Sequence, residues 1–216
     1  MQDFILNWNQ KKILKNISFL KKYGIYLAGG TALALYFGHR TSRDLDFYTK
    51  RHFKSSELLK EFRKVFKKDV KEPKEAEDTL WLKIKNTDLS FFRYPYPLIR
   101  PLILYESVKL ASPEDIIAMK IEAIITRGLK RDFIDIYFAI EKYGLKKVLG
   151  FFKEKYPEVF NEYNCLTALT YFEDAEKRNQ GRKRIYIYSG VSWAEIKKFL
   201  IEEVRKYQLN LIKKSI

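Results

Sequence analysis

The chain has 216 residues, 46% of them hydrophobic, which fits one large or two small folded domains and excludes a disordered protein. No run of about 18 uncharged apolar residues occurs, and the N-terminus lacks the basic-then-apolar order of a signal peptide, so we expect no membrane association. The single cysteine, Cys165, excludes an internal disulfide, and we expect a cytoplasmic protein.

The formal net charge of +15 comes from 42 Lys and Arg residues against 27 acidic ones. It fits two interpretations equally well: a solvated lysine-rich surface, or a phosphate-rich partner such as RNA. Part of the excess is clustered, as at residues 50–54, 67–68 and 182–184. The last cluster, Arg182-Lys183-Arg184, is either an RNA contact or a solvated loop.

Hydrophobic periodicity predicts alternating helices and strands in the first half of the chain. An amphipathic helix should end near Gly24, and Ser55 should cap a later helix whose apolar face includes Leu58, Phe62 and Phe66. Two runs around Asn86 predict a hairpin. In chain order, the other expected elements are a buried strand at 25–28, a helix at 31–37, a strand at 45–48, hairpin strands at 79–84 and 89–92, and an edge strand at 103–105.

The character of the sequence changes at Ser112-Pro113-Glu114-Asp115, a strong helix start. Helical patterns then follow at 113–127, 131–143, 145–155, 164–177 and 192–213. We therefore expect two domains, with a boundary near residue 110: a domain with strands and helices at 1–110, and a helical domain at 111–216.

Two carboxylates stand two residues apart at the start of the expected strand at 45–48. Side chains at alternate strand positions project from the same face, so Asp44 and Asp46 can share metal ions. Divalent metals held by carboxylates neutralise charge in phosphoryl and nucleotidyl transfer. The pair therefore indicates that chemistry.

A glycine pair precedes this strand. Gly29 and Gly30 permit a tight turn with close backbone approach, and Thr31 starts a helix whose free amides favour a phosphate. Either pattern alone is also found in ordinary turns and strands. Joined at this spacing, the two predict a site for a nucleotide and its metal.

These residues carry a resemblance. Residues 29–35 and 38–47, Gly-Gly-Thr-Ala-Leu-Ala-Leu and Gly-His-Arg-Thr-Ser-Arg-Asp-Leu-Asp-Phe, are similar to the signature of the abortive-infection nucleotidyltransferase toxins (AbiEii/AbiGii-like), of the polymerase-beta-type nucleotidyltransferase superfamily. Residues 118–124 and 127–137 resemble the second block of this family, and 171–176 with Trp193 and 197–199 resemble its C-terminal segment.

The resemblance implies an α+β fold, with an N-terminal nucleotidyltransferase-like mixed sheet and flanking helices, followed by a helical half that completes the cleft. It implies that Asp44 and Asp46 bind Mg²⁺. Nucleotide binding is expected from residues in the first and second blocks: Gly29, Gly30, Thr31, Arg40, Ser42 and Lys120. For Arg40 and its neighbour His39, a loop-stabilising role is equally compatible with the sequence.

Three residues of the second block are further catalytic candidates. By resemblance, Lys120 reaches the triphosphate, and Asp132 or Asp135 orients Lys120 or the acceptor. From spacing alone, Lys120 could equally be a solvated lysine. Asp132 and Asp135, three residues apart on one helix face near Arg127 and Arg131, could form a structural ion-pair cluster.

The chain departs from the superfamily at one position. Active members carry a third carboxylate on a following strand, and the matching residue here is Ser90. Asp88 would share its face and is our candidate for a third metal ligand beside Asp44 and Asp46. A two-metal Mg²⁺ site is therefore expected, with the second metal depending on Asp88.

The resemblance and the charge together predict a toxin-like, Mg²⁺-dependent enzyme that transfers a nucleoside monophosphate from a nucleoside triphosphate to RNA, such as the 3′ end of a tRNA. A cognate antitoxin is an expected partner. Two alternatives remain: a weak or inactive nucleotide- or RNA-binding member, motivated by Ser90, and a transferase acting on a protein or small molecule.

Overall fold

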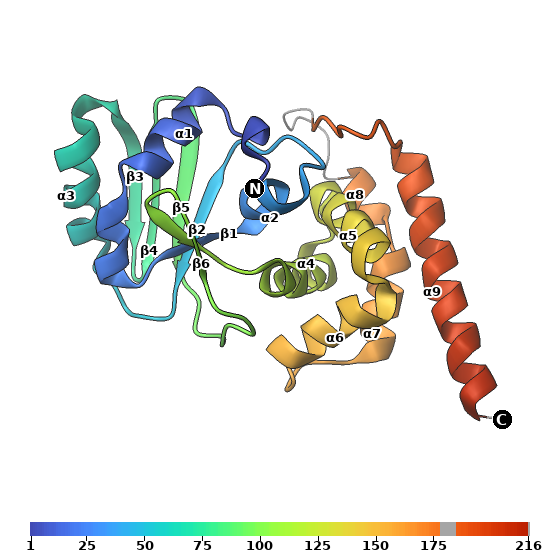
Figure 1. Cartoon of the computed structure of the whole chain (residues 1–216). Helices are drawn as coiled ribbons and strands as arrows, with labels where there is room; N and C mark the ends of the chain where they lie inside the picture. Colours follow the sequence, from blue (N-terminus) through green and yellow to red (C-terminus); the bar gives the residue numbers. More distant parts are fainter. Residues whose placement is uncertain (178–184, 216) are drawn as a thin grey trace. The chain divides into compact units, whose positions relative to one another are not determined.

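A computed structural model describes residues 1–177 and 185–215; the cluster at residues 182–184 lies outside this range. Contacts between residues divide the chain into two compact units, Met1–Pro113 and Glu114–Ile216 (Figure 1). The first contains a sheet and the second is helical. The predicted α+β class is therefore confirmed.

Unit 1 is built on one seven-stranded sheet with strand order β3-β4-β5-β2-β1-β7-β6. The sheet is mixed, because β2 pairs with β5 and β1 with β7 in parallel, while the other neighbours are antiparallel. The strands are β1 (Tyr26–Ala28), β2 (Leu45–Thr49), β3 (Val70–Ala76), β4 (Thr79–Ile84), β5 (Thr87–Arg93), β6 (Ile103–Tyr105) and β7 (Val108–Leu110).

Helical segments connect these strands. They are η1 (Asp3–Ile5), α1 (Trp8–Lys15), η2 (Ser18–Tyr23), α2 (Gly29–Phe37), α3 (Ser55–Phe66) and η3 (Lys67–Asp69). The single helix expected before Gly24 is thus divided into α1 and η2. Ser55 is not the cap of α3, because its hydroxyl lies 2.7 Å from Ala76 O and 2.8 Å from Thr79 O, where it binds the β3–β4 hairpin instead.

The two faces of the sheet differ in character. In β2, Leu45, Phe47 and Thr49 are buried, while Asp46 and Tyr48 are only partly covered. Phe47 stacks on Phe91 of β5 with ring centroids 4.9 Å apart, and Phe62 of α3 contacts Phe91 at 5.2 Å. Each such buried aromatic contributes about 1.5–3 kcal/mol. This packing fixes the pleat and turns Asp46 towards the opposite face.

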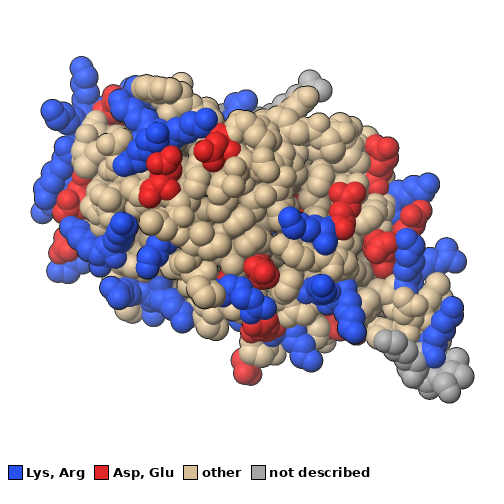
Figure 2. Space-filling view, in the orientation of Figure 1, with Lys and Arg blue, Asp and Glu red and all other residues tan. Residues whose placement is uncertain are grey.

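The outer strand β3 was not predicted. Its residues are exposed beyond Val70, so they show no hydrophobic alternation. Pro73, Lys71 and Lys74 occupy this edge, and proline and lysine both discourage pairing with another chain. In Figure 2, Lys and Arg side chains gather most densely over the part of unit 1 that holds α3. Exposed lysines of α3, η3 and β3 include Lys60, Lys64, Lys67, Lys68, Lys71 and Lys74.

Unit 2 is mainly helical in its described part. The helices are α4 (Pro113–Arg127), α5 (Lys130–Tyr143), α6 (Leu145–Lys155), α7 (Glu162–Thr170), α8 (Glu173–Lys177) and α9 (Trp193–Ser215). Phe133, Phe172 and Trp193 form an aromatic cluster. A capping box is present before α9, since Glu195 N donates to Ser192 Oγ and Ser192 N donates to Glu195 Oε2. The single helix expected at 164–177 is interrupted between α7 and α8.

Candidate functional site

The turn from β1 into α2 requires both glycines. Gly29 has φ +67°, and a Cβ atom there would lie 2.8 Å from Asp46 Oδ2. A Cβ at Gly30 would collide with Arg40 Nη2. The backbone of this turn therefore approaches a carboxylate on one side and a guanidinium on the other. Any residue larger than glycine at either position would force the neighbouring side chain or the backbone to move.

The start of α2 has the properties of an anion site. Ala28 stands at the N-cap, and its methyl group cannot accept a hydrogen bond. The N-cap side chain therefore leaves the first amides of the helix uncapped. The guanidinium of Arg40 lies beside Gly30 and is held in part by a hydrogen bond from Nη1 to Thr41 O (3.0 Å). Helix amides and a guanidinium together favour a phosphate.

Thr31 connects the glycine turn to the acidic strand. Its hydroxyl donates to the main-chain oxygen of Asp44, and its Oγ1 lies 2.7 Å from Ser42 Oγ. Gln10 of α1 holds the same loop, because Nε2 donates to Ser42 O at 3.1 Å. The buried Thr31 side chain thus positions Asp44 through the backbone.

Asp46 is oriented by the neighbouring strand β5. Ser90 lies opposite Asp46 in the parallel register, and its hydroxyl donates to Asp46 Oδ1 at 2.8 Å. Asp46 Oδ2 is the carboxylate oxygen that faces Gly29. The residue that stands where a third carboxylate was expected therefore forms a hydrogen bond with the carboxylate of the pair.

Asp88 shares the face of Ser90, two residues earlier on β5. Its carboxylate lies 3.5 Å from Lys83 Nζ, and Lys83 is also 3.2 Å from Glu72. The structure thus places Asp88 in an ion-pair cluster of β3, β4 and β5. Its role as a metal ligand stays a prediction.

The carboxylates of Asp44 and Asp46 are hard oxygen donors of the kind that Mg²⁺ prefers. They lie at the start of β2, with Asp46 held by Ser90 and covered by the Gly29 backbone. This donor set fits a divalent ion, for which Asp44 and Asp46 would be the protein ligands.

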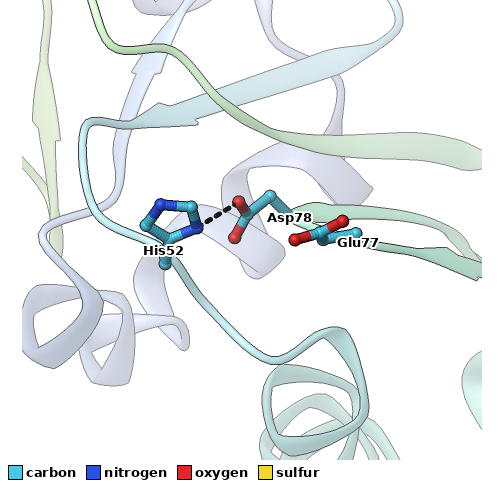
Figure 3. Close-up of side chains that lie close together, drawn as sticks. All are labelled: His52, Glu77 and Asp78. Atoms are coloured by element: carbon cyan, nitrogen blue, oxygen red, sulfur yellow. Dashed lines mark ion pairs between the residues drawn. The ribbon is translucent and has the colours of Figure 1, made fainter.

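A second cluster of potential ligands lies at the β3–β4 turn, among His52, Glu77 and Asp78 (Figure 3). Their ligand atoms lie within 4.8 Å of one another, and His52 Nδ1 is 2.6 Å from Asp78 Oδ2. Asp78 is already engaged, because Phe53 N donates to Oδ1 at 2.8 Å and Arg93 Nε lies 3.9 Å from Oδ2. The imidazole is a donor for zinc-like metals rather than Mg²⁺, so this cluster does not match the expected cofactor.

The candidates of unit 2 form a buried ion-pair network. Lys120 Nζ lies 2.7 Å from Asp132 Oδ1 and 2.8 Å from Asp135 Oδ2. Arg127 Nε adds a bond of 3.2 Å to Asp132 Oδ2. Burial alone would raise the pKa of the Asp132 carboxyl, but the Lys120 ammonium and the Arg127 guanidinium lower that pKa below its usual value. The ammonium of Lys120 is therefore held between two carboxylates.

The sequence analysis missed a second buried pair in unit 2. Lys155 Nζ of α6 lies 2.7 Å from Asp115 Oδ1 of α4, and both side chains are fully buried. Asp115 was interpreted only as part of an acidic first helical turn. Nothing in the local sequence marks its partner, which is 40 residues away.

Most of the chain matches a known protein family. Residues 13–206 match the family described as "Nucleotidyl transferase AbiEii toxin, Type IV TA system". The chain belongs to this family. The AbiEii family consists of nucleotidyl transferases, so the predicted family and enzyme class are both confirmed. Membership implies a nucleotide substrate and an antitoxin partner.

The chain is also similar to a protein of another organism and to solved structures that share its fold. The chain is 34% identical over 192 residues to the uncharacterized protein aq_aa25 of Aquifex aeolicus (strain VF5), covering 86% of this chain and 88% of that protein. JHP933 from Helicobacter pylori shares the fold, with a TM-score of 0.54 at 18% identity over 96% of this chain and 94% of its own. MenT4, a nucleotidyltransferase toxin from Mycobacterium tuberculosis H37Rv, has a TM-score of 0.58 at 14% identity, over 91% of this chain and 80% of its own.

No helix in the described part of this AbiEii-family chain is both long and apolar enough to cross a membrane.

Proposed function

We propose that this AbiEii-family protein is a Mg²⁺-dependent enzyme that transfers a nucleoside monophosphate from a nucleoside triphosphate to the 3′ end of an RNA such as tRNA. The observation that carries the proposal is the packing of the Gly29 backbone against Asp46 at the start of α2. It brings an anion-binding helix terminus next to a carboxylate pair suited to a metal.

In this mechanism the amides at the start of α2 and the Arg40 guanidinium bind the phosphates of the triphosphate. Asp44 and Asp46 would hold Mg²⁺, which when bound neutralises charge on the α-phosphate of the transferred nucleotidyl group. Ser90 orients Asp46 through its hydrogen bond, and Thr31 and Ser42 fix the loop that carries Asp44. The protein thus positions the reactants and supplies charge, as nucleotidyl transfer requires.

RNA as the acceptor is supported by the net charge of +15 and by the exposed lysines of unit 1. A cytoplasmic location and a cognate antitoxin complete the proposal. Lys120 is proposed to assist nucleotide binding, with its ammonium positioned by the salt bridges to Asp132 and Asp135.

A transfer assay tests the proposal. The protein is incubated with each α-labelled triphosphate, Mg²⁺, total RNA and a protein extract, and Asp46→Asn is the matched variant. Label on RNA that is lost in Asp46→Asn and in EDTA is the expected result. Label on a protein or small molecule would refute the RNA acceptor. Triphosphate binding without transfer would refute the enzyme and leave the nucleotide-binding alternative.

A further inference from the structure

Trp81 lies in the same cross-strand row as the candidate catalytic carboxylate. In the register of the sheet, Asp46 of β2 is opposite Ser90 of β5, and Ser90 is opposite Trp81 of β4. Residues that are paired in this way project from the same face. Strands are spaced at about 4.8 Å, so the backbone of Trp81 lies about 10 Å from that of Asp46.

The Trp81 ring belongs to a partly open aromatic surface on that face. It contacts Phe92 edge-to-face at 5.8 Å, and Phe92 contacts Tyr48 at 5.8 Å. Trp81 nevertheless remains 41% exposed. A large exposed indole that is braced by a neighbouring ring offers a flat surface for a ligand, and nucleobases stack on such rings.

The direction of attack in nucleotidyl transfer places the RNA acceptor on the side of this aromatic surface. The proposed phosphate site, at Gly29 and Gly30, follows β1, and the strand order β4-β5-β2-β1 puts β1 and β4 on opposite sides of β2. In nucleotidyl transfer, the attacking and leaving oxygens lie on opposite sides of the reacting phosphorus. With the leaving diphosphate towards β1, the attacking hydroxyl comes from the side of β5 and β4.

The charges around Trp81 suit a nucleic acid. Lys74 of β3 is opposite Trp81 in the register and is exposed. Lys83, two residues along β4, shares the face of Trp81, but it is ion-paired with Asp88 and Glu72, so Lys74 is the lysine that this surface offers to a phosphate. Lysines next to a stacking ring are the combination by which proteins bind single strands, the lysines through phosphates and the ring through the base.

We propose that Trp81, braced by Phe92, stacks on the 3′-terminal base of a single-stranded RNA acceptor. The inference rests on the proposed function, because the direction of attack depends on Asp46 and the glycine turn. It identifies a residue that selects and positions the acceptor and that has no part in nucleotide or metal binding.

The test measures binding without turnover. Two 5′-fluorescein-labelled 12-nucleotide RNAs differ only in the 3′-terminal residue, which carries a base in one and is abasic in the other. Fluorescence anisotropy with Mg²⁺ and no triphosphate gives both dissociation constants. Wild type should bind the complete RNA roughly 5- to 150-fold more tightly than the abasic one, the range expected for one base–aromatic stack.

Trp81→Ala and Trp81→Leu should lose this preference, while Trp81→Phe should keep most of it. Trp81→Leu preserves apolar bulk, so it separates stacking from general packing and replaces Trp81→Ala if that variant unfolds. Trp8→Ala is the matched control, because Trp8 is a tryptophan of α1 that is 65% exposed, and this variant should discriminate as wild type does.

A wild-type protein that binds both RNAs equally, or a Trp81→Leu variant that discriminates as wild type does, would overturn the inference and leave Trp81 available for a protein partner. Loss of discrimination in Trp8→Ala to the same extent would also overturn it. The transfer assay is independent of these results. Transfer to RNA with unchanged kinetics in Trp81→Leu rejects only the stacking role, whereas base discrimination without any transfer rejects only the proposed function.

Discussion

The hydroxyl of Ser90 donates a hydrogen bond to Asp46 Oδ1 at 2.8 Å, from the strand position where the family resemblance predicts a carboxylate. An acid at this position would place a second negative charge against Asp46, which only a bound cation would offset. A serine instead orients the carboxylate without added charge. The Asp46 carboxylate is therefore oriented by a neutral hydrogen-bond donor at this position.

Asp46→Asn should reduce nucleotidyl transfer by roughly 100-fold or more, because it removes a charge that holds the metal. The amide oxygen can still accept the bond from Ser90, so the melting temperature should change little. Initial rates of label transfer and a thermal melt measure the two effects. Wild-type activity in Asp46→Asn would show that the metal is held elsewhere.

Ser90→Asp should make stability depend on Mg²⁺. In EDTA, repulsion between the new carboxylate and Asp46 should lower the melting temperature, and Mg²⁺ should restore more of it than in wild type. Ser90→Asn is the neutral control. Equal responses of Ser90→Asp and Ser90→Asn to Mg²⁺ would argue against a metal at this position.

Gly29→Ala should destabilise the protein by about 1–3 kcal/mol, because alanine at φ +67° is strained and its Cβ would meet Asp46 Oδ2. Gly150→Ala in α6 is the control. A Cβ at Gly150 has no neighbour within 4 Å, and alanine is favoured in a helix by about 1 kcal/mol, so this variant should be more stable. Urea unfolding measures both, and a neutral Gly29→Ala would contradict the close approach.

The lowered pKa of Asp132 should make stability fall in acid. Since its folded-state pKa is below the usual 3.8, the carboxylate contributes stability that is fully present above the unfolded value and is lost as the pH falls through the folded value. Asp132→Asn should reduce stability near pH 7 and flatten the dependence below about pH 4.

Urea unfolding at a series of pH values measures this effect, with the exposed Glu158→Gln as control. An acid dependence in Asp132→Asn as steep as in wild type would mean that other carboxylates dominate it.

The buried pair Asp115–Lys155 should show strong coupling. Lys155→Met leaves a buried carboxylate without this partner and should cost about 3–5 kcal/mol, whereas Lys155→Met combined with Asp115→Leu should cost less than the single change. Unfolding free energies of the two single variants and the double variant complete the cycle. Additive effects would indicate that the ions do not stabilise each other.

The parts of the fold that were predicted correctly have a local physical signal. The amphipathic pattern of α3 follows from the spacing of Leu58, Phe62 and Phe66, and the β4–β5 hairpin from alternation on both strands. β3 lacks such a signal because it is an edge strand whose pairing with β4 supplies its order. The interruption near Tyr171 likewise depends on packing, with Phe172 in the aromatic cluster of Phe133 and Trp193.

For the candidate site, the sequence indicated that the glycine pair and the two aspartates belong together, because their types and spacing suit one chemistry. It could not predict the bond from Thr31 to Asp44 or the contact of Gly30 with Arg40, which depend on the path of the loop between them. The Asp115–Lys155 pair was equally inaccessible, because charged residues in helices are ordinarily on the surface.

The pairing of β1 with both β2 and β7 has a consequence for synthesis. Leu27 is adjacent to Phe47 on one side and to Leu110 on the other, so one edge of β1 stays open until the ribosome has released residue 110. A nascent or truncated chain that ends before β7 would expose the unpaired backbone of β1, which neighbours the strand carrying Asp46 and lies immediately before the glycine turn. Such fragments are therefore expected to be prone to aggregation.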